Sequence, residues 1–141
     1  MAWGSVTTRS FVLASVFGSA KRAGAPTTLY FALTYEAGLP VTVLGAEPTI
    51  GVGSYARVAK TNDDALWTIT NELATNDVAI GWPLSTAAWS LVSCNQWAVF
   101  DASTAGTCWA FGVLDAAVDV IVAGRSPTLA AGALDLTQNA V

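Results

Sequence analysis

The fold is decided by two apolar runs, Trp89-Ser-Leu-Val-Ser-Cys-Asn-Gln-Trp-Ala-Val-Phe100 and Thr107-Cys-Trp-Ala-Phe-Gly-Val-Leu114. The polar segment Asp101-Ala-Ser-Thr-Ala-Gly106 lies between them. Aromatic and β-branched residues favour strands, and a short polar segment that contains glycine is typical of the turn between two paired strands. The sequence therefore predicts an antiparallel hairpin in this region, with its midpoint near Ser103.

Shorter runs of the same kind occur on both sides of the hairpin, separated by glycine, proline, asparagine and aspartate. The further predicted strands are Thr28–Tyr35, a short Val41–Leu44, Tyr55–Lys60, Leu66–Thr70, Val78–Trp82, Val118–Val122 and Ala133–Thr137. Turns are expected at Asn71–Asp77 and at Gly124–Pro127. About eight short strands spaced by turns predict a mainly β fold, an antiparallel β-sandwich or a jelly-roll-like arrangement.

The N-terminal segment, residues 1–24, has a different pattern. Apolar residues up to Phe17 approximate helical spacing, and Gly18 and Gly24 end the pattern. We expect one short helix that packs on the sandwich through Trp3 and Phe17. Because no repeat or linker divides the chain, residues 1–141 are predicted to form a single domain.

The composition indicates a protein that buries surface against other chains. Apolar residues make up 53% of the chain, charged residues 11%, and the mean hydropathy is +0.51. The richest stretch, Phe11–Ala20, is too short and too interrupted to span a membrane, and Lys21-Arg22 follows where a signal peptide needs a cleavage site. Excess apolar surface on a soluble domain favours an obligate oligomer or an assembly subunit.

The charge distribution argues against binding of nucleic acid. The net charge is −4 and the pI is about 4.4, and the six basic residues are scattered apart from Lys21-Arg22. Binding to phosphates requires clustered lysine and arginine.

Few residues of this chain can carry chemistry, because it contains no histidine. Acid and base candidates are the turn carboxylates Asp63, Asp64, Glu72 and Asp77, but turns favour aspartate for local hydrogen bonding alone. Asn62-Asp63-Asp64 lacks the ligand rhythm of a calcium loop. We therefore expect no catalytic residues, no metal site and no cofactor.

The remaining motifs have structural interpretations. Cys94 and Cys108 form no CxxC pair and do not face each other in the predicted hairpin, so buried reduced thiols are favoured over a disulfide. The segment Gly51-Val-Gly-Ser-Tyr-Ala56 imitates a dinucleotide-binding motif but precedes a strand, which predicts a loop. Six tryptophans could stack on sugars if they were exposed, but those in alternating strands favour core or interface positions.

The order of several segments resembles a family of small phage virion proteins, described as tail-fibre-like or head-decoration β-sandwich proteins. A strand of LYVAL type corresponds to Leu29-Tyr-Phe-Ala-Leu33, a Glu-Pro-Gly loop to Glu47-Pro48 with Gly51 and Gly53, and a YARV segment to Tyr55-Ala-Arg-Val58.

Further correspondences extend the resemblance over nearly the whole chain. They are a Phe-Pro then Trp segment at Trp82-Pro83 and Trp89, an FxLFDAxTGG hairpin at Trp97–Gly106, and a GALDLT-like strand at Gly132-Ala-Leu-Asp-Leu-Thr137. The chain departs from the pattern at Trp82, where Phe is usual, and at Ala105, where Gly is usual. The resemblance implies a virion structural role on a β-sandwich without catalytic residues.

The sequence thus predicts a non-enzymatic phage virion protein, assembled in the host cytoplasm, with a capsid decoration or cement subunit as the leading hypothesis. A tail or baseplate adaptor and a glycan-binding module are the alternatives. Expected partners are other copies of the chain, as a homotrimer by resemblance, and virion proteins such as the major capsid protein. The aromatic packing or interface candidates are Trp3, Phe17, Tyr30, Trp67, Trp82, Trp89, Trp97, Phe100, Trp109 and Phe111.

Overall fold

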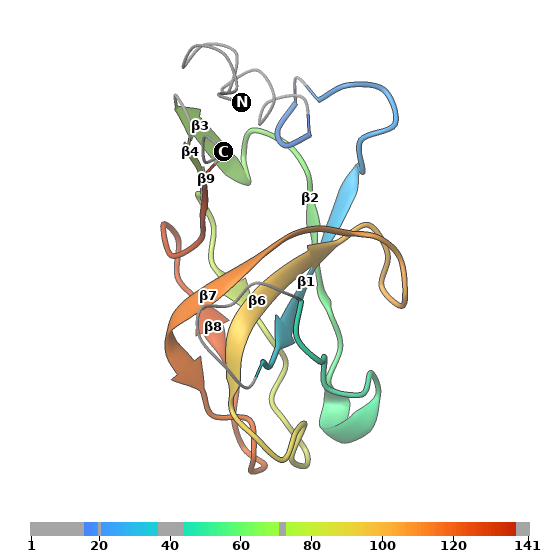
Figure 1. Ribbon diagram of the computed structural model, residues 1–141, viewed down its shortest axis with the longest axis vertical. Helices are drawn as coiled ribbons and strands as arrows, with labels where there is room; N and C mark the ends of the chain where they lie inside the picture. The colour runs from blue at the N-terminus through green and yellow to red at the C-terminus, as the bar shows by residue number, and fades with distance from the viewer. Residues whose placement is uncertain (1–15, 20, 37–43, 71–72, 138–141) are drawn as a thin grey trace. The chain divides into compact units, whose positions relative to one another are not determined.

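The computed structural model describes residues 16–19, 21–36, 44–70 and 73–137, and these residues form a mainly β protein (Figure 1). The strands are β1 (Thr28–Thr34), β2 (Val58–Thr61), β3 (Trp67–Thr70), β4 (Leu73–Asn76), β5 (Ile80–Gly81), β6 (Cys94–Phe100), β7 (Cys108–Val118), β8 (Thr128–Leu129) and β9 (Asp135–Thr137). One 3-10 turn, Val52–Ser54, is the helical element of this part of the chain. The predicted mainly β, antiparallel class is confirmed.

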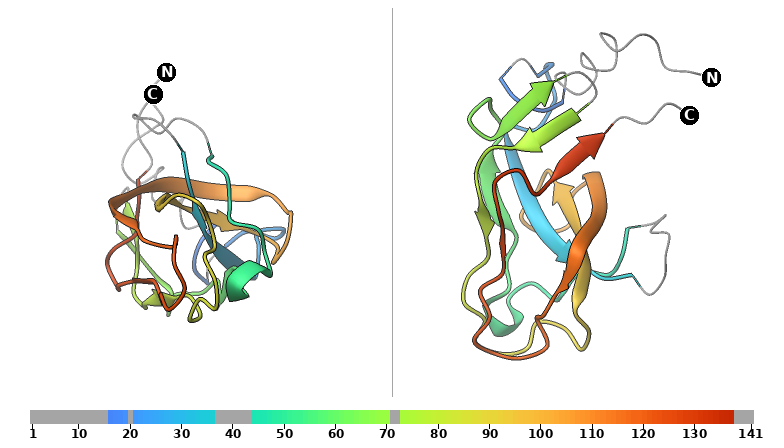
Figure 2. Two further views of the ribbon diagram at one scale, coloured as in Figure 1. Left: turned by 90° about the horizontal axis from the view of Figure 1, so that it is seen from below. Right: turned by 90° about the vertical axis from the view of Figure 1, so that its left-hand side faces the viewer.

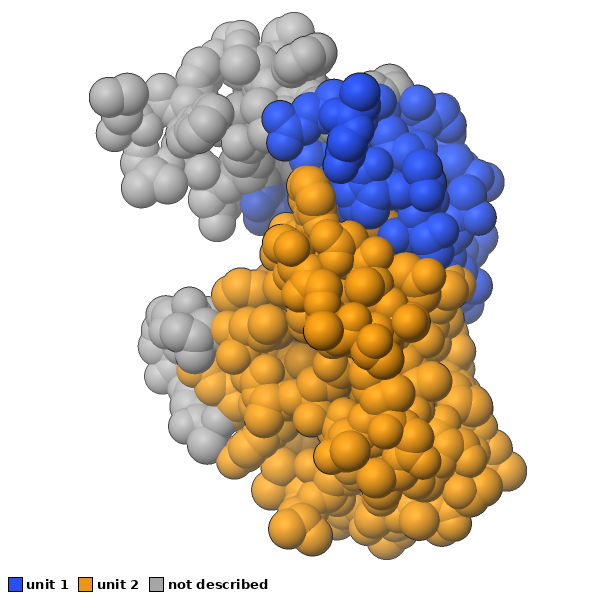
Figure 3. All heavy atoms as spheres, turned by 90° about the vertical axis from the view of Figure 1, so that its right-hand side faces the viewer, with its two compact units in different colours: residues 1–28, 60–80, 129–141 blue, residues 29–59, 81–128 orange. Residues whose placement is uncertain are grey.

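The strands form sheets with the orders β2-β1-β6-β7, β3-β4-β9 and β5-β8. The chain divides into two compact units, coloured separately in Figure 3. Unit 1 comprises residues 1–28, 60–80 and 129–141, and unit 2 comprises residues 29–59 and 81–128. The single domain expected over 1–141 stays a prediction.

The core of unit 2 is built on the long strands β1, β6 and β7, which lie side by side (Figures 1 and 2). β1 pairs antiparallel with β6 from Tyr30 opposite Phe100 to Thr34 opposite Gln96. β6 pairs antiparallel with β7, with Ala98 opposite Phe111. The predicted hairpin is therefore confirmed, because both runs contain mostly strand-favouring residues. Its first strand begins only at Cys94, however, so the prediction is wrong over residues 89–93, which bend.

The hairpin turn is held by Asp101. Its Oδ1 accepts a hydrogen bond of 2.8 Å from the backbone N–H of Thr107, and its Oδ2 accepts one of 3.3 Å from the indole N–H of Trp109. These donors, the Thr107 amide first, lower the pKa of Asp101 below its usual range. The positive φ angles of Ala105 and Gly106, 51° and 77°, reverse the chain. Ala105 therefore occupies a conformation that glycine adopts more easily.

Unit 1 contains the short strands β3, β4 and β9. Trp67 at the start of β3 is buried against Phe17, with ring centroids 5.2 Å apart. β4 pairs with β3 and β9, with Ala74 opposite both Ile69 and Leu136. The turn predicted at Asn71–Asp77 is wrong over Leu73–Asn76, because Asn76 makes buried hydrogen bonds there instead of forming a turn.

Other sequence expectations also require correction. The strand predicted at Val118–Val122 is wrong beyond Val118, where β7 ends, because the segment that follows bends. Of the predicted N-terminal helix, residues 1–15 and 20 lie outside the described residues, and Val16–Ser19 form turns and bends. Most of the predicted Val41–Leu44 strand also lies outside them.

Candidate interaction surface

A largely buried ion pair, Arg57 with Glu47, lies in unit 2. The guanidinium of Arg57 donates three hydrogen bonds to the Glu47 carboxylate, Nη2 to Oε2 at 2.7 Å, Nε to Oε1 at 2.9 Å and Nε to Oε2 at 3.2 Å. The side chains are only 4% and 17% exposed. A two-pronged contact of this kind fixes the orientation of the guanidinium plane as well as neutralising its charge.

The same guanidinium holds the hairpin turn. Its Nη1 donates to the carbonyl oxygens of Ala102 and Ala105, both at 2.7 Å. Its central carbon lies 3.6 Å from the centre of the Phe100 ring, within the range of a cation–π contact. The Arg57 side chain therefore links Glu47 to the hairpin turn at Ala102 and Ala105, which lies more than 40 residues away in the sequence.

Tyr55 completes this cluster. Its hydroxyl donates to Glu47 Oε1 at 2.9 Å and accepts a hydrogen bond of 3.2 Å from the backbone N–H of Leu33. Burial, and then the negative charge of Glu47, raise the pKa of Tyr55 far above its usual range. The phenol therefore stays protonated and serves as a fixed donor.

Six of the exposed apolar side chains of unit 2 lie on loops that hydrogen bonds join to one another. We call this set the loop platform, comprising Val52, Leu84, Leu91, Val92, Ile121 and Val122. Their exposed fractions range from 37% for Val92 to 96% for Leu91. Scattered apolar residues are common on protein surfaces, but a set concentrated on hydrogen-bonded loops is a candidate for protein contact.

Ser85 connects two of these loops. This buried residue donates its backbone N–H to the carbonyl of Arg125 at 2.7 Å, and its carbonyl accepts from the N–H of Gly124 at 2.8 Å. Its hydroxyl accepts from the N–H of Arg125 at 2.9 Å and donates to the carbonyl of Val122 at 3.3 Å. One serine therefore fixes the backbone beneath both Leu84 and Val122.

Gly53 connects the third loop. Its carbonyl accepts hydrogen bonds from the Trp89 indole at 2.6 Å and from the N–H of Thr86 at 3.0 Å. A Cβ at Gly53 would lie 2.6 Å from the carbonyl oxygen of Ala87, so no side chain fits there. Trp89 itself is buried against Tyr55, with ring centroids 5.2 Å apart. The loop that carries Val52 is thus attached to the loop that carries Leu91.

An exposed ion pair lies beside these loops. Arg125 Nη2 and Asp119 Oδ2 are 2.8 Å apart, with side chains 52% and 43% exposed. An exposed pair of this kind contributes little to stability. An apolar surface bordered by a polar pair is the usual composition of a protein contact.

The structure separates the aromatic candidates into groups. Phe17, Trp67, Trp82, Trp89, Trp97 and Phe100 are buried, Tyr30 and Trp109 are half-buried, Phe111 is 39% exposed, and Trp3 lies outside the described residues. The four buried tryptophans, Trp67, Trp82, Trp89 and Trp97, therefore present no open ring face for stacking on a sugar. The sequence analysis missed the loop platform because it considered aromatic residues only. The adjacent pairs Leu91-Val92 and Ile121-Val122 fall within predicted strands, but two consecutive apolar residues break the alternation there, and this break could have indicated the loop platform.

The carboxylate candidates are used locally. Asp63 accepts hydrogen bonds from the backbone N–H groups of Ala65 and Leu66, and Asp77 accepts one from the hydroxyl of Thr68. Asp64 accepts a hydrogen bond of 2.7 Å from the N–H of Ser19, which lowers the pKa of its carboxyl. Glu72 lies outside the described residues. None of the three described carboxylates is paired with another as an acid and base.

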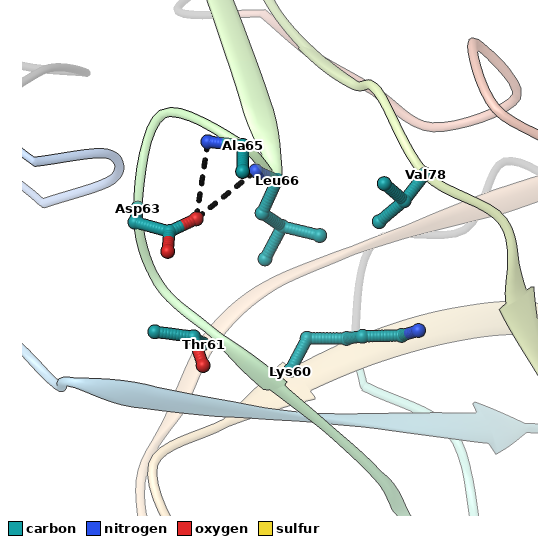
Figure 4. A pocket seen from close by; sticks show the side chains of 6 residues that line it. All are labelled: Lys60, Thr61, Asp63, Ala65, Leu66 and Val78. Atoms are coloured by element: carbon teal, nitrogen blue, oxygen red, sulfur yellow. Dashed lines mark hydrogen bonds between the residues drawn. The ribbon is translucent and has the colours of Figure 1, made fainter.

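Asp63 also borders an open hollow of about 230 Å³ in unit 1 (Figure 4). Its lining residues are Lys60, Thr61, Asp63, Ala65, Leu66 and Val78. The ammonium of Lys60 points away from the Asp63 carboxylate (Figure 4). Cavities that enclose small ligands are usually about 300–1,000 Å³ and more closed.

The cysteines are free thiols, and Cys94 is buried as predicted, whereas Cys108 is only half-buried. Cys94 lies opposite Val118 and Cys108 opposite Phe100 in the β6–β7 pairing. Burial, and then the charge of Glu47, raise the pKa of Cys94 to about 12, and burial raises that of Cys108. At neutral pH both thiols are therefore protonated, which makes them poor nucleophiles and metal ligands.

Among the residues that the structure describes, neither a metal-binding cluster nor a membrane-spanning helix occurs. No three cysteine, aspartate or glutamate side chains among them converge on a point where they could hold a metal ion. In the same part of the chain, no helix has the length and apolar content to cross a membrane.

The sequence matches a known protein family over most of its length. The model of the family described as Podophage GP4 fiber I protein gp80 matches residues 4–137. The chain therefore belongs to this family of phage virion structural proteins. No curated protein matches the sequence.

Proposed function

We propose, from its membership of this fibre family, that the chain is a non-enzymatic structural subunit of a phage fibre and is attached to a neighbouring virion protein through the loop platform. The observation that carries the proposal is a set of exposed apolar side chains on loops whose backbones are fixed by Ser85 and Gly53. A surface that is already ordered loses little conformational freedom when it binds. The β-sandwich or jelly-roll-like arrangement predicted from the sequence is kept within this proposal.

The energetics of the loop platform are suited to assembly. Full burial of one large aliphatic side chain contributes about 1.5–3 kcal/mol. Leu91 is 96% exposed, so nearly all of its burial free energy is gained only when a partner covers it. Summed over the loop platform, the gain is of the size needed to offset an association cost of about 4–15 kcal/mol. The contact requires no reaction, cofactor or metal.

The family supports the fibre over the capsid as the location. The matching family is described by a fibre protein, which favours the tail or fibre alternative over capsid decoration. Decoration of the capsid and contact with the major capsid protein stay predictions. The glycan-binding alternative receives no support from the five described tryptophans, which are buried or half-buried.

Gold-labelled antibodies against the chain, applied to purified virions, test the location. Label on the tail or its fibres supports the proposal. Label spread over the head would support capsid decoration instead, and virions without label would contradict any virion role.

A pair of variants tests the loop platform. Leu91→Asp places a charge at its most exposed position, and we expect it to reduce incorporation into particles by about tenfold or more. The control is Val78→Asp, at a 38% exposed apolar residue of unit 1, which should be incorporated normally. Equal incorporation of both variants would contradict attachment through the loop platform.

A further inference from the structure

Strand β7 is an open sheet edge. In the order β2-β1-β6-β7 it has β6 on one side, and no strand of the described residues on the other. It is eleven residues long, so it presents an unusually long row of backbone N–H and C=O groups along its free side (Figure 2). Such a row pairs with another extended strand, because only a strand repeats donors and acceptors at the same spacing.

This edge lacks the features that protect other edges. Its sequence, Cys-Trp-Ala-Phe-Gly-Val-Leu-Asp-Ala-Ala-Val, contains one charged residue, Asp115, and no lysine or proline. The opposite edge strand of the same sheet, β2, has only four residues and carries Lys60. Short edge strands with lysine are a common defence against unwanted pairing, and β7 has neither of these two features.

Two large apolar side chains of β7, Phe111 and Val113, are exposed. Phe111 and Val113 are 39% and 50% exposed, although their neighbours on β6, Ala98 and Gln96, are fully buried. Between them, Gly112 lies against the ring of Trp97, and a Cβ there would be only 2.9 Å from that ring. The absence of a side chain at Gly112 therefore lets β7 lie close to Trp97. Phe111 and Val113 are then the main exposed apolar side chains of the strand.

We propose that β7 pairs antiparallel with β7 of a second copy of this chain, about a two-fold axis at Gly112. In this register Phe111 lies opposite Val113 of the partner, and the symmetry repeats the pair, so the dimer contains two such pairs and each exposed side chain belongs to one of them. Aromatic and β-branched residues stabilise each other when they face across paired strands. The interface therefore consists of backbone hydrogen bonds and two apolar pairs.

Charge also favours this arrangement. A parallel, in-register pairing places each Asp115 beside its copy, and like charges opposite each other destabilise a sheet. In the antiparallel register the two Asp115 positions are six residues apart along the pair, roughly 20 Å, which is beyond the screening length of about 8 Å at physiological salt. The pairing does not use the loop platform, so it goes beyond the proposed function.

Light scattering on the full chain over a dilution series tests the pairing. We expect a wild-type dimer that dissociates on dilution, and we expect Val113→Lys to weaken association by about tenfold or more because lysine stays at the edge in water. The matched control is Val122→Lys, at a 45% exposed valine of the loop platform, which should dimerise like the wild type. Far-UV circular dichroism checks that both variants are folded.

A second measurement introduces no charge. Phe111→Cys and Val113→Cys are made separately in a Cys108→Ser background, mixed and oxidised. Random pairing of an equal mixture gives twice as much heterodimer as either homodimer, and the proposed register predicts a disulfide-linked heterodimer well above this ratio. Heterodimer at or below the twofold ratio would contradict the register.

The outcomes separate this inference from the fibre proposal. A wild-type monomer at all concentrations, or a trimer that Val113→Lys leaves intact, would overturn β7 pairing. Loss of dimerisation in Val113→Lys with normal incorporation of Val122→Lys would support β7 pairing and contradict the loop platform. Normal dimerisation of Val113→Lys with reduced incorporation of Val122→Lys would contradict β7 pairing and support the loop platform.

Discussion

The two units solve the same problem, how to fix loops around a small β core, with different chemistry. In unit 1 the fixed points are neutral amides. Asn62 accepts from the N–H of Gly18 and donates to the carbonyls of Val16 and Pro26, at 2.8–2.9 Å. In unit 2 the fixed point is the charged pair Arg57 and Glu47.

Asn76 repeats the arrangement in unit 1. Its Oδ1 accepts from the N–H of Leu134 at 2.8 Å, and its Nδ2 donates to the carbonyls of Val78 and Ala130, both at 2.9 Å. Asn62 and Asn76 are each 1% exposed or less. Each amide group makes its hydrogen bonds within its own unit and needs no partner charge. A buried amide can therefore hold a loop without a second charged side chain, whereas each member of an ion pair needs the other to balance its charge.

The largest expected effect is the loss of one member of the ion pair. Arg57→Ala leaves the buried Glu47 carboxylate without its counter-charge, which costs about 3–5 kcal/mol in the free energy of unfolding. Chemical denaturation measures the change. Arg125→Ala, at the exposed pair, should cost about 1 kcal/mol or less. Equal effects would show that burial of the Arg57 pair has no importance.

A double variant sharpens the same point. Replacing both members, Glu47→Leu with Arg57→Met, removes the charge together with its counter-charge. We expect it to cost less than Arg57→Ala alone, because no unpaired buried charge is left. A double variant that is less stable than the single one would show that the hydrogen bonds to the Ala102 and Ala105 carbonyls dominate.

The corresponding change in unit 1 is Asn76→Ala. It leaves the buried N–H of Leu134 without its acceptor, and we expect a loss of about 1–3 kcal/mol. The Leu134 amide should also exchange its hydrogen faster than in the wild type. Unchanged exchange at Leu134 would mean that Asn76 does not hold this segment.

A smaller loss is expected for Tyr55→Phe. The ring stays against Trp89, but Glu47 and the N–H of Leu33 each lose a hydrogen-bond partner. The expected cost is about 1–2 kcal/mol by denaturation. A cost comparable to that of Arg57→Ala would show that the hydroxyl, and not the guanidinium, is the main support of Glu47.

The smallest effect concerns pH and occurs once in each unit. Asp64 is exposed and Asp101 is half-buried, and donated hydrogen bonds lower the pKa of both carboxyls below the ordinary value of 3.8. Their stabilisation is present above that ordinary value and is lost as the pH falls through the lower folded pKa. Carboxyl titration by NMR should show the pKa of both below the ordinary value, and Asp64→Asn with Asp101→Asn should flatten the acid side of the stability profile.

The strands could be predicted from the sequence where side chains alone determine them. Thr28–Tyr35 and Thr107–Leu114 consist largely of aromatic and β-favouring residues, and β1 and β7 lie there. Leu73–Asn76 could not be predicted, because asparagine signals a turn until its buried partners are known. Arg57 and Glu47 are ten residues apart with no pattern between them, so only the structure brings them together.

The candidate surface was harder to predict than the fold. Burial of Trp82 and Trp89 follows from their apolar character, but the exposure of Leu91 does not. Leucine is ordinarily a core residue, and its position in water depends on the loop that Ser85 and Gly53 fix. A sequence pattern records which residues are apolar, and the hydrogen bonds of the loops decide which of them face outward.

The anchoring of these loops has a consequence for proteolysis. A protease cleaves a segment that it can draw out in an extended form, and this requires local opening of the substrate first. The loops around Ser85 and Gly53 can open only by giving up several backbone hydrogen bonds at once. Exposed side chains on such a backbone can remain accessible to a partner while the peptide bonds beneath them resist digestion.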